Sequence, residues 1–130
     1  MAEDKRYKDS RIYGCFVLNR LISELGIDID QDGLEEKLDS ILEAQNKPLS
    51  KEEIKHEIKS NHYMTEKVIA SLESDGLIKV EKDDARYRIF ITKKGVLHAR
   101  KFNALYNELY REQIREHYRF RRMPYWFDDQ

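Results

Sequence analysis

The stretch that decides the fold is residues 61–80, NHYMTEKVIASLESDGLIKV. It begins with polar residues and continues with Val68, Ile69 and Leu72 at the spacing of one helical face. Gly76 then stands where a helix can stop, and the β-branched residues that follow at once predict a strand. A helix with an exposed polar start that leads directly into a strand is typical of the second helix of a helix-turn-helix.

The segment before this stretch predicts the first helix of such a pair. Pro48 cannot continue the helical pattern that precedes it, so the chain becomes extended there. Ser50 and Glu53 have the S-x-x-E spacing of a capping box. The short helix that this box opens would turn Ile54 and Ile58 inward.

Two more helices are predicted nearer the amino terminus. From about Asp9 to Leu25, with Asp9 or Ser10 as its cap, apolar residues occupy more than one side of the helical wheel, so this helix needs partners on several sides. From about Leu34 to Gln45 they form a single stripe. The acidic link between them, DIDQDG, begins like a calcium-binding loop but lacks the final glutamate, so we expect a capped turn without calcium.

Two β-rich runs, residues 77–82 and 87–92, predict a hairpin, and a long helical pattern follows from about Val96 to Arg122. A helix of about 25 residues is about 37 Å long, longer than a small core covers. We therefore expect this helix to pair with its twin in a homodimer, with a fold-back onto the amino-terminal helix of a monomer as the alternative. The residues expected at the dimer interface are Phe16, Phe102, Leu105, Tyr106, Leu109, Gln113, His117 and Phe120.

The last segment, HYRFRRMPYWF, mixes arginines with aromatic residues. Such mixtures can stack on nucleic acid or bind phosphates. Because Pro124 is followed by an aromatic cluster, we favour a tail that docks into a groove on a dimer partner.

Together these elements predict a mainly α fold with a small β-hairpin: a winged helix-turn-helix with an added amino-terminal helix and a long carboxy-terminal helix. The predicted division is residues 1–33 for the amino-terminal helix and acidic turn, 34–95 for the winged-helix domain, and 96–130 for the dimerisation helix and aromatic tail.

The segments LESDGLIKV and ITKKG are similar to the LExxGLI and LTxxG patterns of the MarR and PadR families of winged-helix regulators. The chain also resembles small archaeal winged-helix proteins with a dimerising carboxy-terminal helix. The resemblance covers about residues 34–122 and implies a DNA-binding dimer. The chain departs from the MarR pattern in having one long helix after the hairpin, where MarR proteins usually have more, and in its short, acidic wing.

The second helix of a helix-turn-helix enters the major groove with its amino-terminal residues toward the base edges. Here the residue types suit that role, because Asn can bond adenine, Thr can meet a thymine methyl group and Glu can accept from cytosine. The residues predicted to read bases are Asn61, His62, Tyr63, Thr65, Glu66, Lys67 and Ser71. The alternative interpretation is that these polar residues only cap and solvate the helix.

Basic residues in and around the hairpin predict contacts with DNA phosphates, which would make affinity fall with salt. These residues are Lys59, Lys82, Arg86, Arg88, Lys93 and Lys94. A charged hairpin edge also guards against aggregation, which is the alternative interpretation. Asp83 and Asp84 argue against deep insertion of the hairpin tip into the minor groove.

Length and composition limit the classes of function. The 130 residues make about one ordinary domain, and the net charge of −1 means that any nucleic-acid surface must be local. Cys15, the single cysteine, excludes an intramolecular disulfide, and its apolar setting predicts a buried, inert thiol. We expect no secretory leader and no membrane span, and hence a cytoplasmic, nucleoid-associated protein.

Nothing in the sequence predicts an enzyme. The four histidines are scattered and have no metal-ligand spacing. There is no glycine-rich phosphate loop, nucleophile motif or pair of catalytic carboxylates. We therefore expect no catalytic residue, no bound metal and no cofactor.

The leading interpretation is sequence-specific binding of double-stranded DNA by a homodimeric transcriptional regulator. Two alternatives stay open: a nonspecific architectural or chromatin DNA binder, and a winged-helix protein-protein interaction module, which the near-neutral charge favours. MarR-like dimers often hold small ligands, so the resemblance implies a place for a small-molecule effector. Tyr13, Phe16, Phe102 and Tyr106 could line such a pocket, although a packed core is the simpler interpretation.

Overall fold

The computed structural model describes residues 10–128 and is mainly helical, with five helices and one two-stranded antiparallel hairpin in that range. The elements are α1 (Ser10–Leu25), α2 (Leu34–Glu43), α3 (Lys51–Ile58), α4 (His62–Ser74), β1 (Ile78–Asp83), β2 (Arg86–Ile91) and α5 (Lys93–His117). The predicted order of helices and strands is confirmed. Asp9, expected as a cap of α1, and the segment expected to carry no leader lie outside the described residues.

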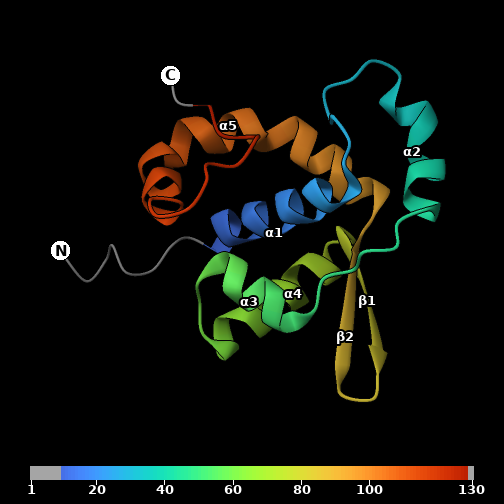
Figure 1. Ribbon diagram of the computed structural model, residues 1–130, viewed down its shortest axis with the longest axis horizontal. Helices are drawn as coiled ribbons and strands as arrows, with labels where there is room; N and C mark the ends of the chain where they lie inside the picture. The colour runs from blue at the N-terminus through green and yellow to red at the C-terminus, as the bar shows by residue number, and fades with distance from the viewer. Residues whose placement is uncertain (1–9, 129–130) are drawn as a thin grey trace.

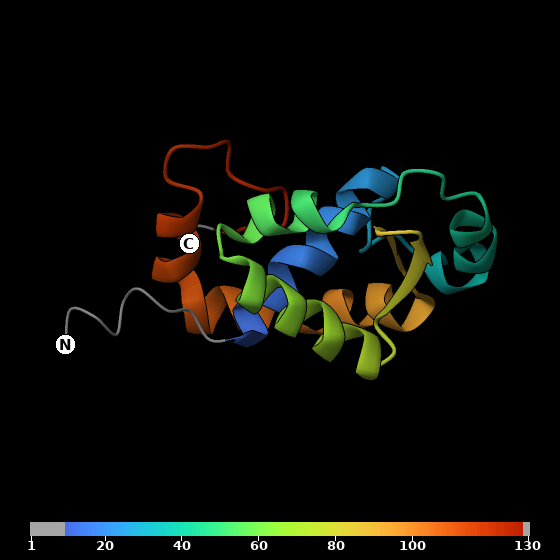
Figure 2. The same ribbon diagram turned by 90° about the horizontal axis from the view of Figure 1, so that it is seen from below.

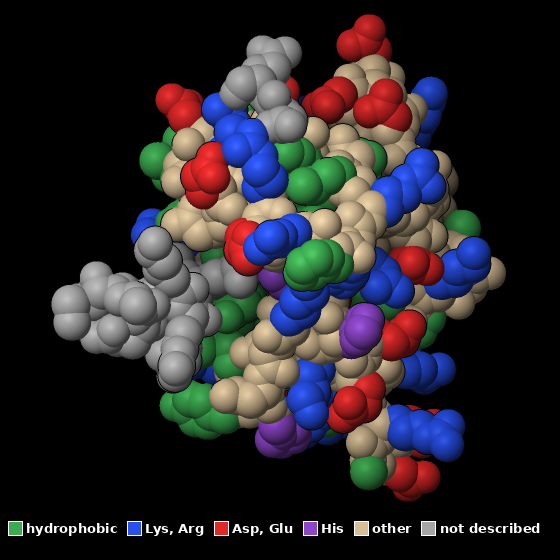
Figure 3. Space-filling view, turned by 60° about the vertical axis from the view of Figure 1, so that its left-hand side comes forward, with side chains coloured by type: hydrophobic (Ala, Val, Ile, Leu, Met, Phe, Trp, Pro, Cys, Tyr) green, Lys and Arg blue, Asp and Glu red, His purple; other side chains and the backbone are tan. Residues whose placement is uncertain are grey.

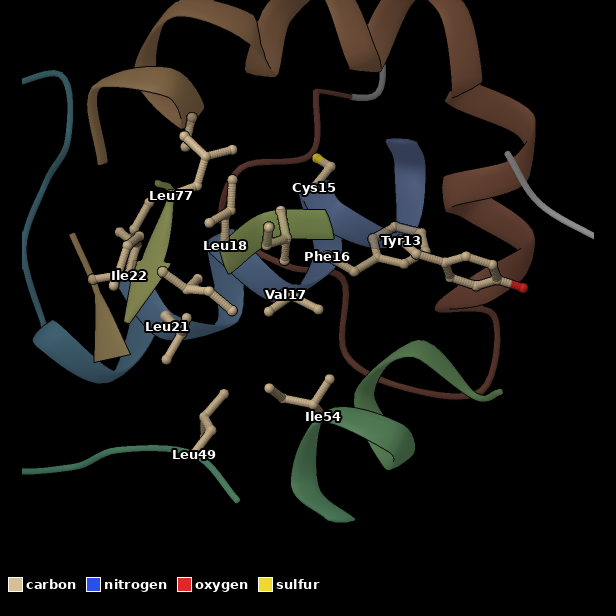
Figure 4. Packing of buried hydrophobic residues seen from close by; sticks show 14 of the residues in the cluster. Tyr13, Cys15, Phe16, Val17, Leu18, Leu21, Ile22, Leu49, Ile54 and Leu77 are labelled. Atoms are coloured by element: carbon tan, nitrogen blue, oxygen red, sulfur yellow. The ribbon is translucent and has the colours of Figure 1, made fainter. Parts of the chain in front are cut away.

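Helix α1 is buried on almost every side, and the other elements are arranged around it. It runs through the middle of the molecule, with α5 on one side and α3 and α4 on the other (Figure 1). All residues from 12 to 19 are buried. Figure 4 shows side chains leaving α1 in different directions, Leu18 toward Leu77 and Val17 toward Ile54. The expectation that this helix needs several partners is confirmed, since α3, α4, α5 and β2 of the same chain all pack on it.

Capping interactions set the ends of α3 and α4. The predicted capping box is present, because Ser50 Oγ accepts from the Glu53 N–H at 3.1 Å and Glu53 Oε1 accepts from the Ser50 N–H at 2.9 Å. At the end of α4, Gly76 has φ 75°, and the Leu77 N–H reaches back to the Leu72 carbonyl at 2.9 Å. This reversal sends the chain from α4 straight into β1.

The hairpin pairs Ile78 with Ile91 at its base and Asp83 with Arg86 at its tip. Leu49, in the extended link before α3, exchanges two backbone hydrogen bonds with Ile89 of β2, at 3.0 and 2.9 Å. The link therefore adds a short third strand to the hairpin and fixes α3 relative to it. From this base the hairpin extends away from the helical body (Figure 1).

Helix α5 differs from its prediction in two respects. It ends at His117 instead of near Arg122, and its backbone leaves helical geometry at Tyr110 (φ −125°, ψ 24°). The bend lets α5 pack along α1 of its own chain, which is the fold-back arrangement. Its two most exposed apolar residues are Leu105 and Leu109, 45% and 59% exposed. None of the helices among residues 10–128 is long and apolar enough to span a membrane.

Two residues expected at a dimer interface are instead part of the core of one chain. Phe16 and His117 are 0% and 2% exposed, and their rings stack with centroids 4.1 Å apart. They leave no surface for a partner because α1 and α5 cover each other at this point. The tail covers the same site, since Trp126 packs against Phe16 and Tyr118. The tail, expected from the sequence to dock on a dimer partner, thus docks on its own chain instead.

Gly95 marks the closest approach of α5 to the start of β1, and replacing it tests this packing. A Cβ at this position would lie 2.2 Å from the Leu77 carbonyl oxygen and 2.8 Å from Ile91 Cγ1. We expect Gly95→Ala to lower the free energy of unfolding by about 3 kcal/mol, measured by urea denaturation. Gly14→Ala is the matched control, because its Cβ would meet only the end of the Leu72 side chain, at 3.2 Å. Equal stability of the two variants would contradict this packing.

Candidate nucleic-acid interface

Helix α4 turns one face to solvent at its amino-terminal end. Asn61 caps the helix, its Oδ1 accepting from the Met64 N–H at 2.7 Å. At about 100° per residue, Tyr63, Lys67 and Ala70 fall on one stripe, and all three are exposed. We call these three residues the α4 stripe. The side chain of Tyr63 is 74% exposed, which is unusual because most aromatic side chains are at least partly buried.

The residues predicted to read bases separate into three groups. His62, Tyr63, Lys67 and Ser71 are exposed as expected. Asn61 is used as the helix cap. The prediction for Thr65 is wrong, because its side chain is fully buried and its hydroxyl donates to the Asn61 carbonyl at 2.8 Å. Thr65 is two residues after Tyr63, so its side chain lies about 200° around the helix from that of Tyr63 and faces the core.

Glu66 is held by the neighbouring helix. Its Oε2 accepts from Lys51 Nζ at 2.7 Å, and His62 Nε2 lies 3.7 Å from the same oxygen. The hydrogen bond from Lys51 lowers the pKa of Glu66 and, reciprocally, raises the pKa of Lys51. This ion pair joins the start of α3 to the start of α4 and leaves Glu66 only partly available to a ligand.

A cleft of about 430 Å³ separates α4 from the hairpin. It is lined on the α4 side by Glu66, Ala70 and Glu73, and on the hairpin side by Val80, Lys82 and Tyr87. The ammonium groups of Lys51 and Lys82 lie over the Tyr87 ring, 4.3 and 5.0 Å from its centroid. Two lysines are thus held at the edge of the cleft by one aromatic ring.

The basic residues predicted to bind phosphates do not form one group. Lys82, Arg86 and Arg88 lie on the hairpin, where Arg88 Nη2 is 3.2 Å from Glu81 Oε1. Lys93 and Lys94 lie instead in the first turn of α5. Their ammonium groups contact the Asp39 carboxylate at 3.6 Å and the Asp75 carbonyl at 2.8 Å.

Lys94 is therefore bound to the carboxyl end of α4, about 18 Å along the helix from its amino-terminal end. The prediction that it joins the hairpin lysines in one surface is wrong, because the chain turns away from the hairpin at Thr92.

A buried polar cluster behind the α3–α4 turn was not predicted. Glu57 is 7% exposed; its carboxylate accepts from Arg20 Nη1 at 3.0 Å and from the Tyr118 hydroxyl at 2.8 Å. The Glu57 carbonyl is 2.7 Å from His117 Nε2 and accepts from Arg121 Nη2 at 3.1 Å. Burial, and then the charge of Glu57, raise the pKa of Tyr118 above its usual range, so its hydroxyl stays a donor.

Lys59 belongs to the same cluster. It ends α3 in the left-handed conformation (φ 51°), and its ammonium donates to the His117 carbonyl at 2.7 Å. Lys59, which was predicted to bind phosphate, therefore has a structural role instead: it attaches the end of α3 to the end of α5. We call the cluster the turn clamp; its members are Arg20, Glu57, Lys59, His117, Tyr118 and Arg121. It attaches the α3–α4 turn to α1 and to the end of α5, and so holds the start of α4 in place.

Charge is unevenly distributed over the surface. Residues 26–46 contain seven Asp or Glu and one Lys, whereas residues 117–124 contain three Arg and no acid. The carboxyl end of α3 adds Lys55 and His56, and the start of α4 adds His62. Figure 3 shows Lys and Arg side chains across the middle of one face, near histidines and interleaved with Asp and Glu side chains. Of these two segments, residues 117–124 thus carry the excess of positive charge and residues 26–46 the excess of negative charge.

Three expectations concern the interior of the described residues: an effector pocket, the thiol of Cys15 and the absence of a metal site. Tyr13 and Phe16, considered as lining of an effector pocket, are packed in the core. Burial raises the pKa of the Cys15 thiol to about 12, which makes it unreactive. Among residues 10–128, no group of three or more His, Cys, Asp or Glu side chains is placed to hold a metal ion.

Replacing Glu57 tests the turn clamp. Glu57→Gln removes the charge between Arg20 and Arg121, so we expect the free energy of unfolding to fall by about 2–4 kcal/mol in chemical denaturation. Glu24→Gln is the control, because Glu24 also pairs with Arg20, at 3.3 Å, but is a third exposed. A loss no larger than that of Glu24→Gln would show that the clamp does not hold the turn.

Among the described residues, the α4 stripe thus runs from the turn that the turn clamp holds to the cleft beside the hairpin, which Ala70 lines. No protein-family model, no curated protein and no solved structure matches the chain.

Proposed function

We propose that the chain is a homodimeric transcriptional regulator that binds double-stranded DNA at specific sequences through a winged helix-turn-helix of the MarR and PadR kind. The observation that carries this proposal is the α4 stripe. It lies on the outer side of the second helix of a tight helix pair, beside a hairpin, and no described element covers it. An uncovered helix of this diameter fits the major groove.

The side chains of α4 suit base reading in different ways. Lys67 can donate to guanine, Ser71 can donate or accept, and Ala70 can meet a thymine methyl group. Tyr63 and His62 stand at the end that would enter the groove first. The turn clamp already fixes this end of α4, so the helix would not have to become ordered when it binds DNA. The entropy cost of ordering would be avoided, which favours affinity.

The hairpin would then lie along the DNA backbone. Lys82, Arg86 and Arg88 are exposed on it and can neutralise phosphates. Asp83 and Asp84 at its tip would be repelled by the backbone, so contact along the side of the hairpin fits the charges better than insertion of the tip.

A second copy of the chain would cover the outer face of α5. Asn103 and Asn107 point toward α1 and the tail, and Leu105 and Leu109 lie roughly opposite them on the helix. Two neighbouring exposed leucines on the outer face of this helix can form an isologous contact with the same leucines of a second copy. The interface proposed now contains Leu105, Leu109 and Gln113, with Phe102 and Tyr106 beside them. Phe120, also expected there, lies beyond the end of α5 and is no longer included.

Selection of duplexes from a random DNA pool tests sequence-specific binding. We expect enrichment of a palindromic motif at near-physiological salt. Tyr63→Ala and Lys67→Ala should each weaken binding to that motif about 10-fold to 100-fold, because a base contact contributes about 1–3 kcal/mol of discrimination. Binding to unrelated duplexes should change little, as measured by fluorescence anisotropy.

Lys37→Ala is the matched control, because Lys37 is an exposed lysine on α2. Uniform retention of the pool without a motif would point to an architectural DNA binder. If the protein retained no duplex DNA from the pool, the DNA-binding proposal would be contradicted. A protein-interaction module would then be the remaining interpretation.

The proposed dimer is tested by molar mass in solution. Light scattering after size-exclusion chromatography should give twice the 15.7 kDa of one chain. The double substitution Leu105→Glu with Leu109→Glu should give the mass of one chain with unchanged helical circular dichroism, because charges would replace the apolar contact. Lys37→Glu should remain dimeric. A wild-type mass of one chain would contradict the proposal.

A further inference from the structure

Residues 119–123, RFRRM, form an exposed cationic segment directly after α5; we call it the arginine segment. Arg119 and Arg122 are both exposed, and Phe120 between them is 86% exposed. No acidic residue occurs from position 117 to position 127. A soluble surface rarely keeps a phenylalanine so fully exposed among arginines without a binding role.

The turn clamp holds the arginine segment beside the start of α4. Arg121 points inward, where its Nη2 donates to the Glu57 carbonyl at 3.1 Å, and Lys59 Nζ donates to the His117 carbonyl at 2.7 Å. These two hydrogen bonds attach the α3–α4 turn to the end of α5 at two points. Figure 2 shows the end of α5 next to the link between α3 and α4. The arginine segment therefore lies beside the α3–α4 turn, which leads into α4.

The charges of the two outward arginines are available to a ligand. Arg122 forms no ion pair with any residue that the structure describes. Arg119 lies 3.6 Å from Glu116, but both side chains are more than 60% exposed, and such pairs are weak enough to exchange for a phosphate. The Arg119 guanidinium also lies 5.1 Å from the centroid of the Phe120 ring, which restrains its direction.

The hairpin alone supplies little positive charge. Residues 78–91 contain four Lys or Arg against three Asp or Glu, with the acids concentrated toward the tip. A duplex seated on α4 would meet stronger positive charge on the other side of the helix, at the arginine segment. The planar guanidinium group of arginine forms bidentate hydrogen bonds with phosphate oxygens, which the lysine ammonium group cannot do.

We propose that the arginine segment is a second backbone-binding element, in which Arg119 and Arg122 contact phosphates of duplex DNA flanking the bases that α4 reads. The inference rests on the proposed function. In this arrangement α4 supplies the sequence preference, and the hairpin and the arginine segment hold the backbone on either side of it.

The salt dependence of duplex binding tests the inference. Each phosphate contact contributes about 0.9 to the slope of log affinity against log salt. We expect the double substitution Arg119→Gln with Arg122→Gln to lower that slope by about 1.8, and thus to weaken binding about 60-fold at 0.1 M salt. The ratio of affinities for the selected motif and a scrambled duplex should stay unchanged. The double variant Lys37→Gln with Lys101→Gln removes two exposed charges elsewhere and should keep the wild-type slope.

A positional readout complements the slope. A photoreactive benzoylphenylalanine in place of Phe120 should crosslink to duplex outside the selected motif. Crosslinks only within the motif would contradict a flanking contact. Circular dichroism should show that the double arginine variant folds, because both side chains are exposed.

The outcomes separate the inference from the function on which it rests. If the wild type binds its motif and the double arginine variant keeps the full slope, the arginine segment does not bind DNA and the regulator proposal stands. If the wild type retains no duplex, both are overturned. If the arginines affect binding to phosphatidylglycerol vesicles or single-stranded RNA but not to duplex, duplex DNA is the wrong ligand.

Discussion

The all-round burial of α1 is the constraint on which the rest of the structure depends. A helix of 16 residues with apolar side chains on every side cannot remain in water, so the chain has to surround it. The α3–α4 pair covers one side and α5 the other. No proline or glycine lies near Tyr110, so the bend of α5 at that residue follows from packing around α1 and the tail, not from the backbone itself.

Polar groups at this centre decide how the covering helices are aligned. Asn19 of α1 and Asn103 of α5 exchange two amide hydrogen bonds, both 2.9 Å long. Asn107 donates to the Trp126 carbonyl and accepts from the Asp128 N–H, which seats the tail. A shift of α5 along α1 by one turn would leave these buried amides unpaired, at a cost that apolar contacts alone would not impose. The turn clamp extends the same principle to the α3–α4 turn.

The parts of this arrangement that were predictable from sequence are those encoded over a few neighbouring residues. The capping box at Ser50, the glycine end of α4 at Gly76 and the two strands each depend on local chemistry, and each is present as predicted. The side of α4 that faces solvent was also predictable, apart from Thr65, whose hydroxyl is satisfied by the backbone four residues earlier.

The turn clamp was not predictable, because Glu57 meets partners 37 to 64 residues away along the chain. A glutamate in a short helix does not by itself predict such a contact, and neither do scattered arginines in a charged sequence. The inward face of α5 was missed for a related reason. Its asparagines look solvent-exposed in the sequence, and only the matching amide on α1 makes their burial favourable.

The separation of acidic residues at α2 from basic residues at the turn end has a consequence for motion in solution. A molecule with a net charge of −1 gains little attraction to a polyanion from its total charge. Its acidic residues at α2 and its arginines at 119–122 nevertheless form two separate groups of opposite charge, which together act as a dipole. In the field of a polyanion such a dipole experiences a torque within about 10 Å, the screening length at 0.1 M salt, and rotates before it touches. An encounter with a polyanion would then begin with residues 119–122 already turned toward it, so that orientation, and not attraction, would set the productive fraction of collisions.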